Sequence, residues 1–209
     1  MRVILGSSSP RRRALLNELG IGFDTLSPDA DETALPGETP RDYAVRVARA
    51  KAESALTIPD TGREPALLIA CDTIVTIDGV IIGKPADRGD ALRILGMLAG
   101  KTHSVISAVA LVRVNGLTEL RTGAEESRIT FKPLGREGLE AYLDSIHYMD
   151  KAGAYAAQEH GRHIIERIEG SVTNVIGFPL RLFFRMLAEM GVADALLSPS
   201  LKYHPAHRA

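Results

Sequence analysis

Apolar and polar positions along this chain follow two periods, and their order predicts an α/β protein. Short apolar runs bounded by glycine, proline or serine are typical of strands, and apolar residues three and four positions apart are typical of helices. The first pattern predicts strands over residues 3–5, 23–26, 66–77, 104–114 and 117–131. The second predicts helices over residues 10–19, 40–56, 87–98, 136–143 and 179–190. Strands and helices that alternate in this way are typical of an α/β fold.

One expected strand is interrupted by a carboxylate. The run Ala66–Cys71 is continuously apolar, as in a strand covered on both faces, and Asp72 follows before Thr73–Ile77 resumes the strand. Burying an unpaired charge costs several kcal/mol, so Asp72 should lie beside a cation, a metal ion or hydrogen-bond donors. Asp72 is therefore the best functional candidate in the chain. The alternative is a structural aspartate that caps a neighbouring turn.

Residues 7–13, Ser-Ser-Ser-Pro-Arg-Arg-Arg, lead from the first strand into a helix whose first turn is cationic. Helix N-termini carry partial positive charge, so each arginine there costs about 0.3–1 kcal/mol unless an anion is bound. Backbone N–H groups, hydroxyls and guanidinium groups would together surround a phosphate. The alternative is an ordinary serine N-cap with solvated arginines. The predicted phosphate ligands are Ser7, Ser8, Ser9, Arg11 and Arg12.

Two lysines are candidates for the same site. Lys51 lies on the apolar stripe of the helix over residues 40–56, so it either points into a cleft or lies at the edge of the stripe and extends its ammonium group to water. The dipeptide Asp78-Gly79 predicts a two-residue hairpin turn that brings Lys84 back beside Asp72. A plain surface lysine is the alternative for Lys84.

Composition excludes several classes of protein. The chain has 209 residues, 45% of them hydrophobic and 24% charged, and a formal net charge of -1, which offers no overall attraction to nucleic acid. Its one cysteine, Cys71, excludes an internal disulfide and is more typical of a small buried side chain than of a nucleophile. It has no run of 18 apolar residues and no signal-like start. We expect a soluble cytoplasmic protein without nucleic-acid or membrane partners.

The chain shows no internal repeat and no linker. We therefore expect residues 1–195 to form a single domain and residues 196–209 to form a flexible tail. No G-x-x-x-x-G-K-[ST] pattern is present, which argues against a P-loop NTPase. Aromatic residues make up only 5% of the chain, too few to favour a stacking surface for nucleic acid.

Several ordered motifs together resemble the Maf family of nucleotide pyrophosphatases. The resemblance extends over about residues 3 to 190. It rests on Ser7–Arg12, Ala-Arg-Ala-Lys ending at Lys51, Cys71–Val75, Gly83–Pro85, His103–Val105, Asp150–Tyr155 with Gln158, and Gly170–Val175 with Gly177 and Pro179. It implies a mixed elongated sheet with flanking helices that form two lobes around a cleft, similar to inosine triphosphate pyrophosphatases. It also implies hydrolysis of a nucleoside triphosphate to a monophosphate and pyrophosphate, and a homodimer.

The resemblance also assigns roles. It implies that Asp72 is the proton acceptor and that Arg12, Thr73 and Gln158 select the base, in a combination similar to the branch acting on dTTP and UTP. We expect Lys51 and Lys84 to stabilise charge at the cleaved bond. Glu32 and Asp72 are expected to hold a divalent cation, Mg²⁺ or Mn²⁺, because hard oxygen ligands suit these ions. A merely solvated acidic loop is the alternative for Glu32.

Three other functions stay open. The first is the related 7-methyl-GTP pyrophosphatase activity, whose branch usually carries different residues at the three base-selecting positions. The second is a nucleotide-binding regulator of septum formation without significant turnover. The third is a simple phosphate or sugar-phosphate binder, which would not need Asp72, Lys51 and Lys84 to converge.

Overall fold

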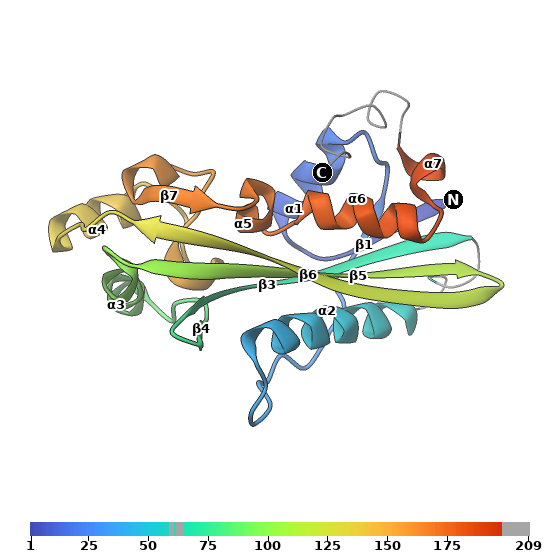
Figure 1. Ribbon diagram of the computed structural model, residues 1–209, viewed down its shortest axis with the longest axis horizontal. Helices are drawn as coiled ribbons and strands as arrows, with labels where there is room; N and C mark the ends of the chain where they lie inside the picture. Colours follow the sequence, from blue (N-terminus) through green and yellow to red (C-terminus); the bar gives the residue numbers. More distant parts are fainter. Residues whose placement is uncertain (59–60, 62–64, 198–209) are drawn as a thin grey trace.

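A long mixed β-sheet runs through the molecule and carries helices on both faces (Figure 1). The computed structural model describes residues 1–58, 61 and 65–197. The strands are β1 Arg2–Gly6, β2 Asp24–Leu26, β3 Ala66–Ile77, β4 Val80–Ile82, β5 Thr102–Asn115, β6 Leu117–Phe131 and β7 Ile165–Glu169. Their order is β2-β1-β3-β5-β6-β7, with β4 paired to β3. Strand β1 runs parallel to β2 and β3, and every other pair is antiparallel.

Helices flank the sheet along its length. They are α1 Pro10–Glu18, α2 Pro40–Leu56, α3 Arg88–Leu98, α4 Arg136–Asp144, α5 Val172–Ile176, α6 Leu180–Glu189 and α7 Ala193–Leu196, with 3₁₀ turns η1 Ala152–Ala154 and η2 Gly161–His163. Helix α2 lies on one face, α1 and α6 lie on the other, and α3 and α4 lie at the far end (Figure 1). None of the helices in the described ranges is long and apolar enough to cross a membrane. The predicted α/β class, a mixed elongated sheet with flanking helices, is confirmed.

Local sequence signals account for the element boundaries. The Thr39 hydroxyl accepts the N–H of Asp42 at 3.2 Å and Pro40 opens α2, two features that favour the start of a helix. Asp78 and Gly79 both adopt positive φ, 51° and 79°, which a type I′ hairpin turn requires. Ile77 accordingly pairs with Val80.

The hydrophobic core divides into three groups. On one face of the sheet, the fully buried residues that α2 contributes to the first group are alanines, whose small side chains let the helix approach closely; these are Ala44, Ala48, Ala52 and Ala55. On the other face, Phe183 and Leu187 of α6 are fully buried with Leu5. The third group surrounds Phe131 and Tyr155 at the end of the sheet that carries α3 and α4. The apolar stripe of α6 therefore contributes to the core.

The sequence pattern did not reveal three short elements, β7, α5 and α7. Strand β7 has five residues and α5 has five, so neither is long enough to show a clear period. The predicted tail begins at residue 196, the last residue of α7, and its residues 198–209 lie outside the described part of the chain.

Strand β3 has a gap in its pairing near the middle of the sheet. Strand β1 pairs with it as far as Ala70, and β4 pairs with it only from Val75 onward. Within the described structure, residues 71–74 are therefore paired along one edge only, with β5. The chain leaves β1 at Ser7 beside this gap. Ligands of α/β proteins bind at such places, beyond the carboxyl end of a parallel strand.

Burial of His103 makes stability depend on pH. The residue is 3% exposed, its Nε2 lies 3.0 Å from the Tyr155 hydroxyl, and burial lowers its pKa from 6.5 to about 4. Between these two values the unfolded chain binds a proton that the folded protein does not. The contribution of His103 is therefore fully present above pH 6.5 and decreases as pH falls, by about 3 kcal/mol at pH 4.

We expect this to be visible in urea unfolding of the native protein and of His103→Gln at several pH values between 4 and 7.5. The variant is less stable at pH 7.5, because it loses the packed ring. Its free energy of unfolding should fall less steeply towards acid. If the free energy of unfolding fell equally steeply with pH in both proteins, the pH dependence could not be assigned to His103.

Candidate active site

A cleft of about 400 Å³ opens at the gap in the edge of β3. The end of β1, the first turn of α1, the loop before α2, α2 itself and the end of α5 contribute to its walls. Ten of the predicted site residues line it: Ser7, Ser8, Ser9, Arg11, Arg12, Glu32, Lys51, Asp72, Thr73 and Lys84. The fold thus brings together residues from five separate parts of the sequence.

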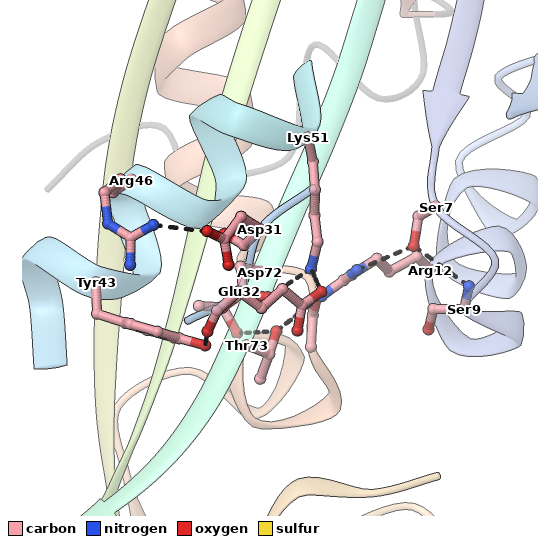
Figure 2. Close-up of polar contacts among 12 residues, drawn as sticks. Ser7, Ser9, Arg12, Asp31, Glu32, Tyr43, Arg46, Lys51, Asp72 and Thr73 are labelled. Carbon is pink, nitrogen blue, oxygen red and sulfur yellow. Dashed lines mark hydrogen bonds and ion pairs between the residues drawn. The ribbon is translucent and has the colours of Figure 1, made fainter. Parts of the chain in front are cut away.

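Lys51 joins two carboxylates on the α2 side of the cleft. Its Nζ lies 2.8 Å from Asp72 Oδ1 and 2.7 Å from Glu32 Oε1 (Figure 2). The Lys51 and Asp72 side chains are 15% and 9% exposed, whereas that of Glu32 is 53% exposed. The ammonium group therefore points into the cleft. It also offsets the cost of burying the Asp72 charge.

Arg12 forms the opposite wall of the cleft and is held by three acceptors. Its Nε donates to the Gly177 carbonyl at 2.9 Å, and its two terminal nitrogens donate to Ser7 Oγ at 2.9 Å and Thr73 Oγ1 at 3.0 Å (Figure 2). Gly177 ends α5 with a φ of 114°, a conformation that favours glycine. Thr73 in turn lies 2.9 Å from Ser107 Oγ on β5. The guanidinium group is thus fixed in place before any ligand binds.

Adjacent residues of β3 serve the two walls. Successive side chains of a strand point to opposite faces, so Asp72 reaches Lys51 on α2 while Thr73 reaches Arg12 on α1. Because the strand edge is open here, a ligand can contact groups from both faces of the sheet. Because β3 supplies one residue to each wall, the cleft combines a carboxylate cluster with a cationic wall.

The serine loop, residues 7–9, keeps hydrogen-bond donors available in the cleft. Ser9 holds the N-cap position of α1, yet its side chain makes no capping hydrogen bond, and its N–H donates to Ser7 Oγ at 3.2 Å. Arg11 Nε is buried and has no hydrogen-bond partner among the residues described. Burial is the main cause that lowers the pKa of Arg11, with the charge of Arg12 adding to it and that of Asp150 opposing it. These features favour a bound anion over the ordinary serine cap.

Lys84 follows the β3–β4 hairpin, as the Asp78-Gly79 turn predicts. Its side chain is exposed and lines the cleft, and it forms no ion pair within the described ranges. Cys71 also lines the cleft, but burial raises its pKa to about 11. A thiol with that pKa carries almost no thiolate at neutral pH, so Cys71 is unsuited to nucleophilic catalysis.

Asp150 and Lys151 line the cleft although the sequence analysis gave them no site role. The Lys151 side chain is 5% exposed, and its Nζ lies 2.9 Å from Asp150 Oδ1 and contacts the His147 carbonyl. The pKa of Asp150 is lowered, because its hydrogen bond to Lys151 and the nearby Arg11 outweigh the opposing effect of burial. The sequence feature that could have identified them as site residues is the charged pair itself, which directly precedes the small residues 152–154.

Gln158, a predicted base-selecting residue, does not line the cleft in this structure. Its side chain is exposed, and its Nε2 lies 3.3 Å from Glu159 Oε1. Glu159 lies 3.6 Å from Lys151, so among the described residues Gln158 is linked to the cleft through these two charges. Its role in selecting the base stays a prediction.

The donor set of the cleft fits a divalent cation that is completed by a ligand. No group of three or more His, Cys, Asp or Glu residues that could hold a metal ion occurs in the part of the chain that the structure describes. Glu32 and Asp72 nevertheless supply two carboxylates within reach of one ammonium group. Mg²⁺ is commonly bound by one or two carboxylates together with water and substrate phosphates. The site suits such a cation better than a metal held by protein groups alone.

Fold and cleft together define an α/β protein with a polar cleft at an open strand edge, lined by five cationic and three carboxylate side chains of the described residues. The chain belongs to the family of Maf-like proteins, whose model matches residues 2–190, so the resemblance seen in the motifs is confirmed.

Two relatives of the chain have the same name. The chain is 44% identical over 186 residues to the dTTP/UTP pyrophosphatase of Burkholderia pseudomallei, an alignment that covers 85% of this chain and 88% of that protein. It is 41% identical over 197 residues to the dTTP/UTP pyrophosphatase of Shewanella oneidensis, with 92% and 100% covered. Among solved structures, the Ham1 protein of Staphylococcus aureus aligns with a TM-score of 0.49 at 12% identity, over 91% of this chain and 100% of that one. A likeness at that level carries no argument about function.

Proposed function

We propose that this protein is a nucleoside triphosphate pyrophosphatase that hydrolyses dTTP and UTP at the α–β bond, giving the monophosphate and pyrophosphate. The observation that carries the proposal is Lys51, whose ammonium group joins Glu32 and Asp72 in the same cleft as Arg11 and Arg12. Relatives that are 41–44% identical and named dTTP/UTP pyrophosphatase support the choice of substrate.

The cationic groups account for binding of the triphosphate. A nucleoside triphosphate brings about four negative charges, and its cleavage depends mainly on positioning and on neutralising charge. The buried Nε of Arg11 and the hydroxyl of Ser9 are donors that a phosphate would satisfy. Lys84 is an exposed cation on the cleft wall. We assign Lys51 and Lys84 to the charge that develops at the α–β bridge and on the departing pyrophosphate.

Asp72 is the residue that we assign to proton transfer. Its carboxylate is held by Lys51 at 2.8 Å, which leaves its other oxygen to orient and deprotonate the attacking water. A divalent cation, Mg²⁺ or Mn²⁺, when bound by Glu32 and Asp72, would neutralise phosphate charge and acidify water. Lys51 keeps the two carboxylates close together and limits their mutual repulsion.

Arg12 and Thr73 are the residues that we assign to selection of the base. Arg12 has three of its five N–H donors engaged by the protein, so its plane is fixed and the remaining donors point in set directions. A rigid donor set discriminates strongly, because a base that leaves buried polar groups unpaired binds poorly.

The test is release of pyrophosphate from a panel of canonical and base-modified nucleoside triphosphates, 7-methyl-GTP included, with Mg²⁺ or Mn²⁺. We expect one pyrophosphate and one monophosphate per substrate molecule, formed fastest from dTTP or UTP. Preference for 7-methyl-GTP would show that the protein is a 7-methyl-GTP pyrophosphatase instead. Binding of nucleotide without turnover would favour the regulator of septum formation.

The proposal also covers the localisation of the enzyme and its binding partners. We propose a cytoplasmic protein that binds the free nucleotide and has no nucleic-acid or membrane partner. The homodimer implied by the family stays a prediction, and the mass of the protein in solution, measured by light scattering, tests it.

A further inference from the structure

We infer that Tyr43 and Arg46 of helix α2 are positioning residues that hold the loop carrying Glu32 against Lys51 and Asp72. The inference rests on the proposed function for its catalytic consequence, since Glu32 matters to turnover only if the cleft is the active site. The structural part rests on contacts alone. We call the group of Tyr43, Arg46 and Glu38 the Arg46 clamp.

The loop that bears Glu32 has little to hold it by itself. Residues 27–39 lie between β2 and α2 and contain no helix or strand. Every residue from Asp31 to Gly37 is exposed, including Leu35 at 53%, so apolar burial does not hold this segment. Keeping a flexible segment in one conformation costs about 1–2 kcal/mol of entropy per residue. Polar contacts must therefore supply the order.

Arg46 supplies most of those contacts. Its Nε lies 2.6 Å from Glu38 Oε1 and its Nη2 lies 2.9 Å from Glu38 Oε2, a two-point pairing. The same Nη2 donates to the Thr33 carbonyl at 2.9 Å. Glu38 Oε2 also accepts the N–H of Leu35 at 3.2 Å. One guanidinium group thus ties both ends of the segment between residues 33 and 38.

Tyr43 holds the backbone of Glu32 directly. Its hydroxyl donates to the Glu32 carbonyl at 2.7 Å, while the Glu32 carboxylate lies 2.7 Å from Lys51 Nζ (Figure 2). Tyr43, Arg46 and Lys51 all belong to α2. A single rigid helix therefore sets the position of the lysine and that of the loop carboxylate that meets it.

The consequence for catalysis is local. Without the clamp, the half-exposed Glu32 side chain would leave Lys51 for much of the time, whereas the buried Asp72 would stay in place. Misplacing a group in an active site by about 1 Å can cost a factor of 10 to 100 in rate. We expect Tyr43→Phe to lower kcat about tenfold while KM for the nucleotide changes little, because the cationic wall is untouched.

The first measurement does not depend on activity. Hydrogen exchange of the amides in residues 27–39, read by mass spectrometry without nucleotide, should be faster in Tyr43→Phe and in Arg46→Met than in the native protein. Arg49→Met is the matched control, because it removes the exposed ion pair of Arg49 with Glu53 on the same helix and leaves the loop alone. Unchanged exchange in Tyr43→Phe, which keeps the fold even if Arg46→Met does not, would overturn the inference.

The second measurement is a double-mutant cycle on pyrophosphate release. If Tyr43 acts through Glu32, then Tyr43→Phe lowers kcat in the native background but has no further effect in Glu32→Gln. Equal loss in both backgrounds, or faster loop exchange with undiminished kcat, would overturn the positioning role. If the native protein released no pyrophosphate, the proposed function would fail, and the exchange data would still decide whether the clamp exists.

Discussion

The Asp72→Asn protein is expected to fold normally and to release pyrophosphate at least about 100-fold more slowly than the native protein. Asparagine has the same shape, and its amide oxygen can still accept the Lys51 hydrogen bond that now measures 2.8 Å. It has no negative charge, so it neither takes a proton from water nor attracts a cation. The variant therefore separates the chemistry of Asp72 from its place in the fold.

Asp78, six residues after Asp72, offers a matched control. Asp78 is exposed and lies in the β3–β4 turn at a φ of 51°, which asparagine also tolerates. Asp78→Asn removes one carboxylate outside the cleft and should keep full turnover. Both variants are to be compared by circular dichroism, by urea midpoint and by steady-state kinetics. A folded Asp72→Asn protein with activity near that of the native protein would exclude Asp72 as the proton acceptor.

Removing the charge of Lys51 should affect both activity and stability. Lys51→Met keeps most of the side-chain volume but leaves Asp72, which is 9% exposed, and Glu32 without their common cation. Breaking a buried ion pair costs about 3–5 kcal/mol, and the open cleft reduces this to about 2 kcal/mol. We expect that loss in urea unfolding, together with a fall in kcat of about 100-fold.

The double variant Lys51→Met/Asp72→Asn separates the two effects. Removing the unpaired carboxylate should restore most of the stability, because no buried charge is left without a partner. Activity should stay lost. Lys101→Met, which removes an exposed lysine outside the cleft, is the control and should leave both quantities unchanged. Full stability in the single variant would show that the Lys51–Asp72 pair contributes nothing to folding.

Most of the fold follows from local signals in the sequence. Thr39 with Pro40 starts α2, Asp78-Gly79 makes the hairpin, and the apolar run before Asp72 forms a buried strand. These features are local because they depend on capping, turn geometry and the period of one element. The site residues could also be selected locally, since a carboxylate in a buried strand and a cationic helix start both conflict with the ordinary preferences of those elements.

Other features depend on contacts between distant parts of the chain, and only the tertiary structure decided them. Lys51 points into the cleft because Asp72 and Glu32 lie beside its ammonium group, although they are 21 and 19 positions away in the sequence. The placement of Asp150 and Lys151 in the cleft, and of Gln158 outside it, depends on how an irregular segment packs against β3 and α3. The sequence by itself determined which residue types carry the chemistry. The tertiary structure decided which of them meet, because the direction of a side chain at a strand edge or in a loop is set by its packing partners and not by the period of its own segment.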